Sequence, residues 1–243
     1  MRDVDDYVKT YLETGDFEHI LVRYRRRKVL EMIHKYMPAS LMEIGCGMEP
    51  LGCYYQPPKH YILFEPGEAF FENAMERLKD LRCELDAFPE PFRPVPELHA
   101  DMIICAGLLH ELEDPWGMLQ DIYDTAGEET IIHVNVPNAF SMHRVLARHM
   151  GLLKDQHELS DRNTLLQQHT VFDMDSLQSM CRFMGFNVLE SGSYFLKPFT
   201  HDQMHKMIAE GVIGEAVLDG LYHMGEEAYG CEIYVNLKKK PKQ

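Results

Sequence analysis

The spacing of apolar residues changes along the chain, and these changes predict alternating helices and strands. Residues 7–37 carry apolar side chains at helical spacing, and Pro38 ends that segment. Short apolar runs of strand length follow at 41–45, 61–64, 83–85, 101–105 and 130–136. Helical spacing returns between them at 68–81 and 116–123. Strands that alternate with helices in this order indicate a layered α/β domain.

The second half of the chain departs from this alternation. Residues 139–169 are polar and rich in His and Arg, which predicts an excursion of helix and loop. A helix is expected at 174–184, with Asp173 as its N-cap and Gly185 at its end. Strands are expected at 186–190 and 232–237. Residues 199–229, between these strands, are too long for a hairpin turn and predict a helical insertion.

These elements predict a Rossmann-like α/β fold, a doubly wound and mostly parallel seven-stranded sheet with a helical insertion before the last strand. Residues 102–105 are wholly apolar, as expected for a parallel strand buried on both faces. We divide the chain into an N-terminal helical segment, 1–37, and one main domain, 38–243. Within that domain the excursion 139–169 is a candidate cap, and the insertion 199–229 is a candidate cap or subunit contact that would make a homo-oligomer.

Charge and cysteine usage exclude several classes of function. With 24 Lys and Arg against 39 Asp and Glu, the net charge is -15, which repels a nucleic acid backbone. No apolar run approaches the roughly 20 residues that span a bilayer. The start of the sequence lacks a signal-peptide pattern, and the cysteines form no C-x-x-C pair. We therefore expect a cytoplasmic protein without a metal site.

A glycine turn at the end of the first strand is the strongest sign of a ligand site. The strand carries Glu43, and Gly45 and Gly47 follow it where a Cβ would block a tight turn and the approach of a ligand. The next strand ends at Glu65, whose carboxylate can accept hydrogen bonds from the hydroxyls of a ribose. This combination predicts a nucleoside-containing cofactor.

A nicotinamide dinucleotide is the competing cofactor. Its binding turn follows the pattern G-x-G-x-x-G, but Pro50 stands at the third glycine position here. Proline there blocks the close approach of a helix that brings pyrophosphate onto backbone amides. The sequence therefore disfavours a nicotinamide-dependent reductase.

Four segments together resemble class I S-adenosylmethionine-dependent methyltransferases: Glu43-Ile-Gly-Cys-Gly47, Glu65, Asp86-Ala-Phe88 and Asp101–Pro115. Residues 136–141 and 169–186 resemble the methyltransferase 11/12-like and ubiquinone-type branches of that family. The resemblance covers about residues 25–195 and the last strand. It implies a methyltransferase domain with S-adenosylmethionine as the cofactor.

The resemblance also assigns cofactor contacts to individual residues. Glu43 and the amides of Gly45 and Gly47 would hold the methionine moiety, and Glu65 the ribose. Asp86 would receive the adenine amino group with Ala87 beside the ring, and Leu108 would line the sulfonium pocket. The sequence departs from the family at Glu49, where a small residue is usual, and at 125–128, where Pro-Gly-Gly is usual. In some members of the family, arginines placed like 23–27 contact the cofactor carboxylate.

The acceptor site is less well marked. Methyl transfer to a hydroxyl needs a base, and histidine is the natural base near neutral pH. His110, directly after the fourth strand, is the first candidate catalytic residue and His143 is the second; His133 and His169 are further histidines in the region. Candidate pocket-shaping residues are Arg144, His157, Arg162 and Tyr194.

The sequence therefore predicts methyl transfer from S-adenosylmethionine to a hydroxyl or amine of a small-molecule or sugar-like acceptor. The alternative is a non-catalytic module that binds S-adenosylmethionine and acts through partners. That alternative is motivated by Glu49, which stands in the glycine loop where the family usually has a small residue.

Overall fold

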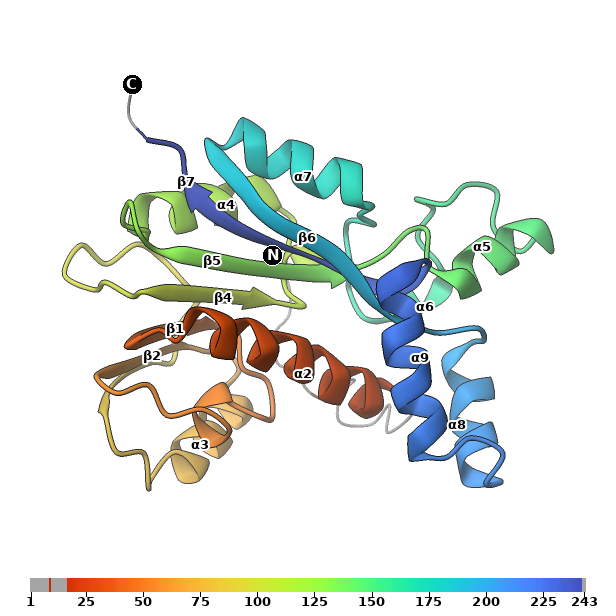
Figure 1. Cartoon of the computed structure of the whole chain (residues 1–243), viewed down its shortest axis with the longest axis horizontal. Coiled ribbons are helices and arrows are strands. Elements are labelled where there is room, and N and C mark those ends of the chain that lie inside the picture. The colour runs from red at the N-terminus through yellow and green to blue at the C-terminus, as the bar shows by residue number, and fades with distance from the viewer. Residues whose placement is uncertain (1–8, 10–16, 242–243) are drawn as a thin grey trace.

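A seven-stranded sheet organises the structure, a computed structural model that describes residue 9 and residues 17–241 (Figure 1). The strand order is β3-β2-β1-β4-β5-β7-β6. The strands are β1 Ser40–Ile44, β2 His60–Phe64, β3 Glu84–Phe88, β4 Met102–Ala106, β5 Ile131–Pro137, β6 Phe186–Leu196 and β7 Gly230–Lys239. The helices are α2 Glu18–Tyr36, α3 Glu68–Arg77, α4 Pro115–Thr125, α5 Met142–His149, α6 Asp161–Leu165, α7 Met174–Phe183, α8 His201–Ala209 and α9 Glu215–Glu227, with short 3-10 turns η1 Leu51–Cys53 and η2 Leu109–Glu111.

The sheet is mixed, which refines the predicted topology. Strands β1 to β5 pair in parallel, whereas β7 lies antiparallel between β5 and β6. The Rossmann-like α/β fold is thus confirmed, with one reversed strand in the sheet. Because β7 is reversed, it begins at the same edge where the parallel strands end.

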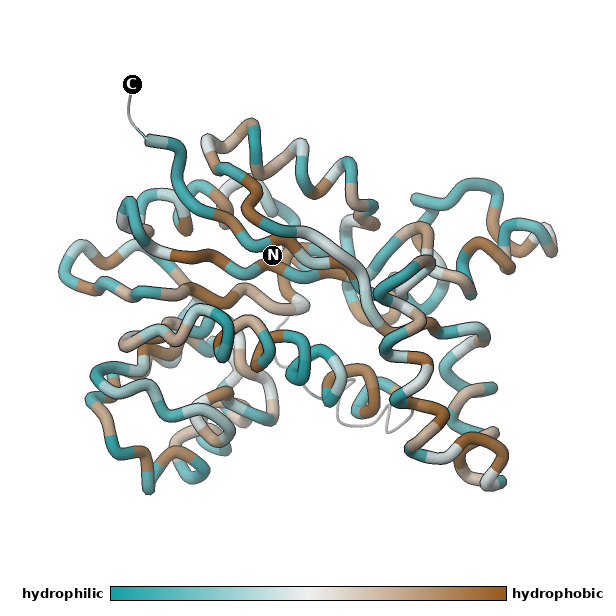
Figure 2. The backbone as a smooth tube through the Cα atoms, viewed as in Figure 1, coloured by the Kyte–Doolittle hydropathy of each residue, from teal (hydrophilic) through white to brown (hydrophobic). Residues whose placement is uncertain are grey.

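Helices cover both faces of the sheet in a three-layer arrangement. One core cluster joins the sheet to α2, α3, α8 and α9, and the other joins it to α4 and α7. Apolar residues concentrate along the central strands and the inward faces of the helices (Figure 2). The helical insertion α8–α9 therefore contributes Met204, Leu218 and Tyr222 to the core.

Local signals in the sequence explain where several elements begin and end. Met37 adopts a left-handed conformation (φ 47°) directly before Pro38, and α2 ends there. Asp173 caps α7 by accepting a hydrogen bond from the Ser176 amide, as predicted. The part of the predicted helix 7–37 that falls on 1–8 and 10–16 lies outside the described residues. Strand β3 extends to Phe88, beyond its predicted end at residue 85.

The predicted excursion 139–169 folds as two short helices joined by a loop. Helix α5 projects away from the body of the molecule beyond the end of the sheet (Figure 1). The Arg144 side chain is buried and holds the following loop, because its guanidinium donates to the backbone oxygens of Gln156 and Glu158 at 2.8 and 2.6 Å. A capping box between Ser160 and Asn163 then starts α6.

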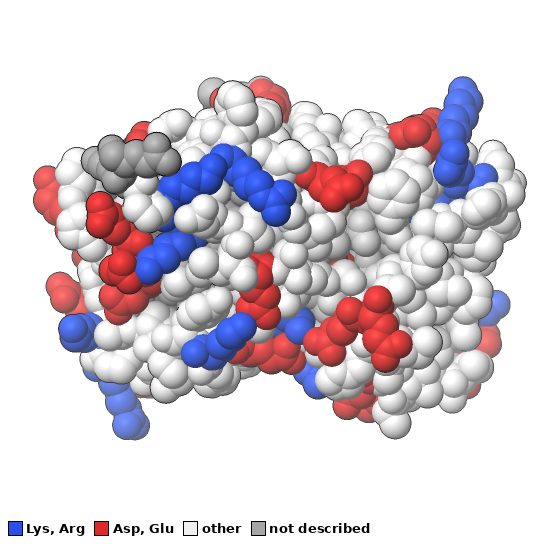
Figure 3. All heavy atoms as spheres, turned by 45° about the horizontal axis from the view of Figure 1, so that its top comes forward, with Lys and Arg blue, Asp and Glu red and all other residues white. Residues whose placement is uncertain are grey.

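Acidic and basic side chains are interspersed on the face shown in Figure 3, with no continuous basic track across it. This pattern agrees with the net charge of -15 and disfavours a nucleic acid surface on that face.

Within the described chain, no helix is both long and apolar enough to cross a membrane.

A chain of buried polar side chains runs through the sheet beneath α2. The Asn236 amide donates to Glu190 at 3.1 Å, and its oxygen accepts from Nδ1 of His133 at 2.8 Å. Nε2 of His133 lies 3.3 Å from the Asn135 amide nitrogen, and Asn135 Oδ1 accepts from the Gly107 amide at 2.8 Å. Burial lowers the pKa of His133 to about 4, so its ring stays neutral at pH 7.

We therefore expect His133→Leu to lower the free energy of unfolding by about 1–3 kcal/mol, because the buried Asn236 amide oxygen and Asn135 amide nitrogen lose their contacts with the His133 ring. Urea denaturation checks this value. The exposed His149 provides the control, and His149→Leu should change stability by less than about 0.5 kcal/mol. Equal stability of the two variants would contradict a structural role for the His133 ring.

Candidate functional site

A cavity of about 1580 Å³ lies over the edge of the sheet where the parallel strands end. Its walls come from the turns after β1 and β4, the start of β7, helix α2 and the 139–169 excursion. Ligands in open α/β folds bind at this edge. Of the predicted site residues, seven line the cavity, namely Glu43, Gly45, Gly47, Glu65, Leu108, His110 and His143.

The glycine turn after β1 leaves open space on its cavity side. Gly45 and Gly47 have positive φ angles of 75° and 54°, which glycine adopts at little cost. A Cβ at Gly47 would meet no atom within 4 Å, and one at Gly45 would meet only the Leu108 side chain at 3.8 Å. The turn therefore exposes bare backbone to a ligand.

Glu65 at the end of β2 is tied to this glycine turn. Its Oε2 accepts hydrogen bonds from the amides of Cys46 (2.9 Å) and Gly47 (3.0 Å), and its Oε1 accepts one from Gly67 (2.9 Å). Burial raises the pKa of Glu65, while the three amides oppose that rise. The carboxylate thus aligns two strand-end turns and also lines the cavity.

Glu43 serves mainly to hold the chain that follows the turn. Its Oε2 accepts from the hydroxyl of Tyr61 and from the Leu51 amide, the latter at 2.9 Å. Burial raises the pKa of Glu43 to about 8, despite these donors, and the nearby Glu65 adds to the rise. Although Glu43 lines the cavity, its carboxylate is engaged inside the protein.

Charged side chains from two helices hold the unusual Glu49 in the glycine loop. Arg26 of α2 forms an ion pair with Glu49, and Arg77 of α3 lies 3.6 Å from the same carboxylate. Asn73 and Arg77 also donate to the backbone oxygen of Met48, at 2.7 and 3.0 Å. The departure from a small residue at position 49 is thus accommodated by partners and leaves the turn intact.

The structure does not place Asp86 and Ala87 at the cavity, contrary to the sequence-based expectation. Strand β3 continues to Phe88, which pairs with Phe64 at the end of β2. Asp86 therefore lies two residues before the strand end, and its carboxylate contacts Nε2 of His60 at 2.9 Å. Pro91 and Phe92, after the strand, line the cavity instead.

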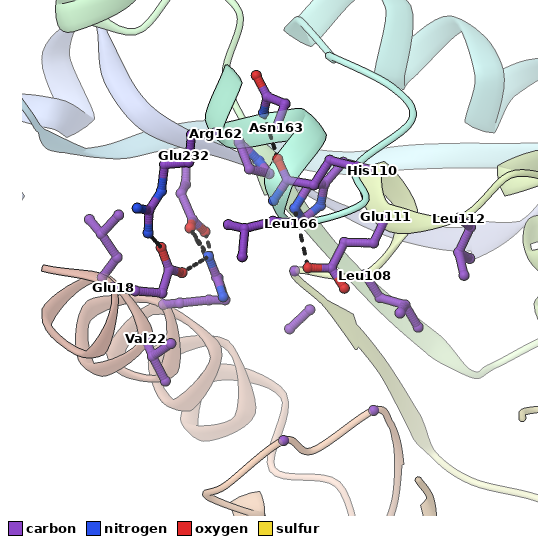
Figure 4. Close-up of a pocket in the computed structure, with 18 of the residues that line it drawn as sticks. Glu18, Val22, Leu108, His110, Glu111, Leu112, Arg162, Asn163, Leu166 and Glu232 are labelled. Atoms are coloured by element: carbon purple, nitrogen blue, oxygen red, sulfur yellow. Dashed lines mark hydrogen bonds and ion pairs between the residues drawn. The ribbon is translucent and has the colours of Figure 1, made fainter. Parts of the chain in front are cut away.

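His110 lies on the short turn η2 directly after β4, beside Glu111 (Figure 4). Both side chains are buried and line the cavity, and Nε2 of His110 is 3.8 Å from Oε1 of Glu111. The backbone oxygen of His110 accepts from the amides of His169 and Thr170, at 2.9 and 3.2 Å. These contacts fix the turn, so an imidazole and a carboxylate face the cavity together.

His143 also lines the cavity, from α5. Its amide donates to the Lys197 backbone oxygen at 3.1 Å, and its Nδ1 is buried with no hydrogen-bond partner among the described residues. Burial and the charges of Lys197, His201 and Arg144 hold the pKa of His143 well below its usual range. The ring is neutral at pH 7 but is a weak base.

A cluster of paired charges forms another part of the cavity wall (Figure 4). Nε of Arg25 lies 3.0 Å from both carboxylate oxygens of Glu232, which also accepts from the Tyr194 hydroxyl at 2.6 Å. Glu18 lies 3.6 Å from Arg25 and 3.7 Å from Arg162. Burial alone would raise the pKa of Glu18, but its hydrogen bond to His201 and these arginines hold that pKa below its usual range.

The other expected site residues have structural contacts. Tyr194 is buried beneath Glu232, and Arg144 holds the excursion loop. His157 lies 2.9 Å from Asp173, outside the cavity lining, and the ring of His169 is also outside it. Of the pocket-shaping candidates, Arg162 and Arg144 line the cavity.

Sequence reasoning missed Glu18, Glu111, Arg25 and Glu232 as individual site residues. Glu232 had a usable signal, because it is a charged residue that opens the last strand. Arg25 belongs to the run 23–27 that the resemblance marks, but nothing in the sequence separates it from its neighbours. Glu18 had no signal, since it lies on a helix among other charged residues. In the described chain, no group of His, Cys, Asp and Glu is arranged to hold a metal ion.

The raised pKa of Glu43 predicts a pH dependence of stability. The folded protein keeps a proton on Glu43 up to about pH 8, whereas the unfolded chain releases it near pH 4.5. Stability conferred by this group is therefore lost as the pH rises through that window. Glu43→Gln mimics the protonated form and should gain roughly 2–4 kcal/mol relative to wild type between pH 5 and pH 9.

Urea denaturation at the two pH values measures this gain. Glu72→Gln, at an exposed position on α3, provides the control and should show no relative change. If Glu43→Gln and the control behave alike, Glu43 does not hold its proton in the folded protein.

Comparison with known proteins agrees with this arrangement. Residues 21–191 match the family model described as methyltransferase domain. Among curated proteins, none matches the sequence. An S-adenosylmethionine-dependent methyltransferase from Mesorhizobium loti superposes with a TM-score of 0.55 at 10% identity, over 82% of this chain and 90% of that one.

Two further solved structures share the fold. A possible histamine N-methyltransferase from Thermotoga maritima gives a TM-score of 0.52 at 14% identity, covering 92% of this chain and 98% of its own. A plantazolicin methyltransferase, solved with a monoazolic desmethyl analogue and S-adenosylhomocysteine, gives 0.57 at 13% identity, covering 98% and 95%. The chain therefore belongs to the methyltransferase domain family and is a class I S-adenosylmethionine-dependent methyltransferase.

Proposed function

We propose that the protein transfers a methyl group from S-adenosylmethionine to a hydroxyl or amine of a small molecule. The observation that carries this proposal is one cavity that joins the open glycine turn and Glu65 to the buried pair His110 and Glu111. Family membership favours an enzyme over the alternative of a non-catalytic binding module.

The residues at the glycine turn fit the cofactor. The space beside Gly47 admits a ligand, and the backbone of Gly45 and Gly47 would face the methionine moiety. Oε1 of Glu65 accepts from one amide only, whereas Oε2 accepts from two, so Oε1 has the capacity to accept from a ribose hydroxyl as well. The Leu108 side chain lies beside Gly45 in the cavity lining and would cover the sulfur side. When bound, the cofactor supplies an electrophilic methyl group.

The acceptor requires alignment and, for a hydroxyl, removal of a proton. We assign His110 as the catalytic base, with Glu111 beside it. His143 is a weak base because burial and nearby positive charges hold its pKa well below its usual range. Closure of the cavity by α2 and the 139–169 excursion would exclude water from the acceptor.

The finer placement in the methyltransferase 11/12-like, ubiquinone-type branch remains part of this proposal, supported by the motifs at 136–141 and 169–186. A cytoplasmic location and a subunit contact at 199–229 likewise remain predictions from sequence. The core packing of α8 and α9 restricts any such contact to their outer faces.

Glu65→Gln should weaken binding of S-adenosylhomocysteine by about 10–100-fold, because it removes the charge that strengthens hydrogen bonds from ribose. Isothermal titration calorimetry measures the change. Asp86→Asn is the matched control, and it should bind like wild type because Asp86 lies outside the cavity. If both variants lose affinity equally, Asp86 also contributes to cofactor binding. If neither variant loses affinity, Glu65 does not bind the cofactor.

His110→Ala should lower kcat by about 10²–10⁴-fold while binding of S-adenosylhomocysteine stays within about twofold of wild type. Turnover is measured by release of S-adenosylhomocysteine across a panel of amine and alcohol acceptors. His169→Ala, an exposed histidine outside the cavity lining, is the control and should retain full turnover. An unchanged kcat in His110→Ala would show that transfer proceeds without this base.

A further inference from the structure

The cavity is larger than one ligand requires. Its volume of about 1580 Å³ exceeds the roughly 300–1,000 Å³ typical of small-molecule pockets. The proposed cofactor site uses the part beside β1 and β2, so a second molecule of substantial size fits beside it. The side chains around that remaining space therefore indicate what kind of acceptor it holds.

Leucines of the 139–169 excursion line this remaining space. Leu152, Leu153, Leu159 and Leu166 all face the cavity. Leu152 and Leu159 are 70% and 42% exposed, whereas Leu166 is buried. Single exposed leucines are ordinary on a protein surface, but leucines that share one concave lining mark a site for apolar ligands.

These leucines are held in place by the fold. Buried Arg144 donates to the backbone on both sides of His157, which fixes the loop between Leu152 and Leu159. Leu166 follows α6, whose capping box is complete. On the opposite wall, Val22 of α2 also lines the cavity (Figure 4). The apolar part of a ligand that binds here would contact the leucines of the excursion on one side and Val22 on the other.

The charged groups nearby are engaged with one another. Glu232 is bound by Arg25 and Tyr194, and Glu18 by Arg25 and His201. Leu166 lies between this charged cluster and the pair His110 and Glu111 (Figure 4). A ligand that occupies the space around Leu166 therefore meets hydrocarbon from that side, and each methylene that it buries there adds to its affinity.

We propose that the acceptor is an amphipathic small molecule, with its hydroxyl or amine toward His110 and an apolar body of several carbons along Leu152, Leu159, Leu166 and Val22. This assignment rests on the proposed methyl transfer and names its substrate class. It replaces a sugar-like acceptor with one whose affinity depends on buried hydrocarbon.

The test is a homologous series of n-alkylamines from butylamine to decylamine, each below its micelle concentration. Binding to protein saturated with S-adenosylhomocysteine is measured by calorimetry. Each added methylene should tighten binding about fourfold until the chain leaves the cavity. Glucosamine, the sugar-like comparator, should bind at least tenfold more weakly than octylamine.

Leu152→Ser combined with Leu159→Ser should reduce the gain per methylene to less than twofold. Leu165→Ser is the matched control: Leu165 is 56% exposed on α6 but does not line the cavity, so the fourfold gain should persist. A flat series in wild type, tighter binding of glucosamine than of octylamine, or an equal loss in the control would each overturn the proposed acceptor class.

The design separates this proposal from the one on which it rests. If S-adenosylhomocysteine itself fails to bind, the methyl-transfer proposal fails. If it binds normally and the alkylamine series is flat, only the apolar acceptor is wrong.

Discussion

The burial of carboxylates at one edge of the sheet is the constraint on which the site depends. Glu43, Glu65 and Glu232 each lie at or beside a strand end and are almost fully buried. A buried carboxylate is costly unless donors surround it or it keeps a proton. The structure uses both solutions, with amides around Glu65, a guanidinium on Glu232 and a raised pKa at Glu43. Satisfying these groups fixes the turns that shape the cavity.

The same constraint links the site to the interior of the sheet. Arg25 packs against Gly107, where a Cβ would lie 2.8 Å from the guanidinium. The Gly107 amide is held by Asn135, at the end of the polar chain that includes His133. Gly107 is therefore contacted from two sides: by Asn135, which links it to the neutral His133, and by Arg25, which is paired with Glu232. The turn after β4, which carries His110, is positioned from both sides.

Much of the fold and part of the site could be predicted from local sequence. Apolar runs and the glycine turn predicted β1 and the positions of Gly45 and Glu65 at strand ends, because these signals lie within a few residues of the structure they specify. The predicted end of the third strand at residue 85 was too early, because an apolar pattern does not mark the residue at which an edge strand ends, so Asp86 lies inside β3 and outside the cavity lining. The Glu18–Arg25–Glu232 cluster could not be predicted as a cluster, since tertiary packing alone brings α2 and the start of β7 together.

The ion pair between Arg26 and Glu49 has a consequence for the evolution of the family. Each residue alone would be a liability, since Glu49 adds charge to a loop that approaches a ligand and Arg26 is partly buried on α2. Arg26 and Glu49 neutralise one another, with Arg77 also beside Glu49, so a small residue at position 49 would leave Arg26 without its acidic partner. Relatives with a small residue at the position of Glu49 should therefore be free to lose the arginine. The two positions are expected to vary as a pair in alignments of related chains.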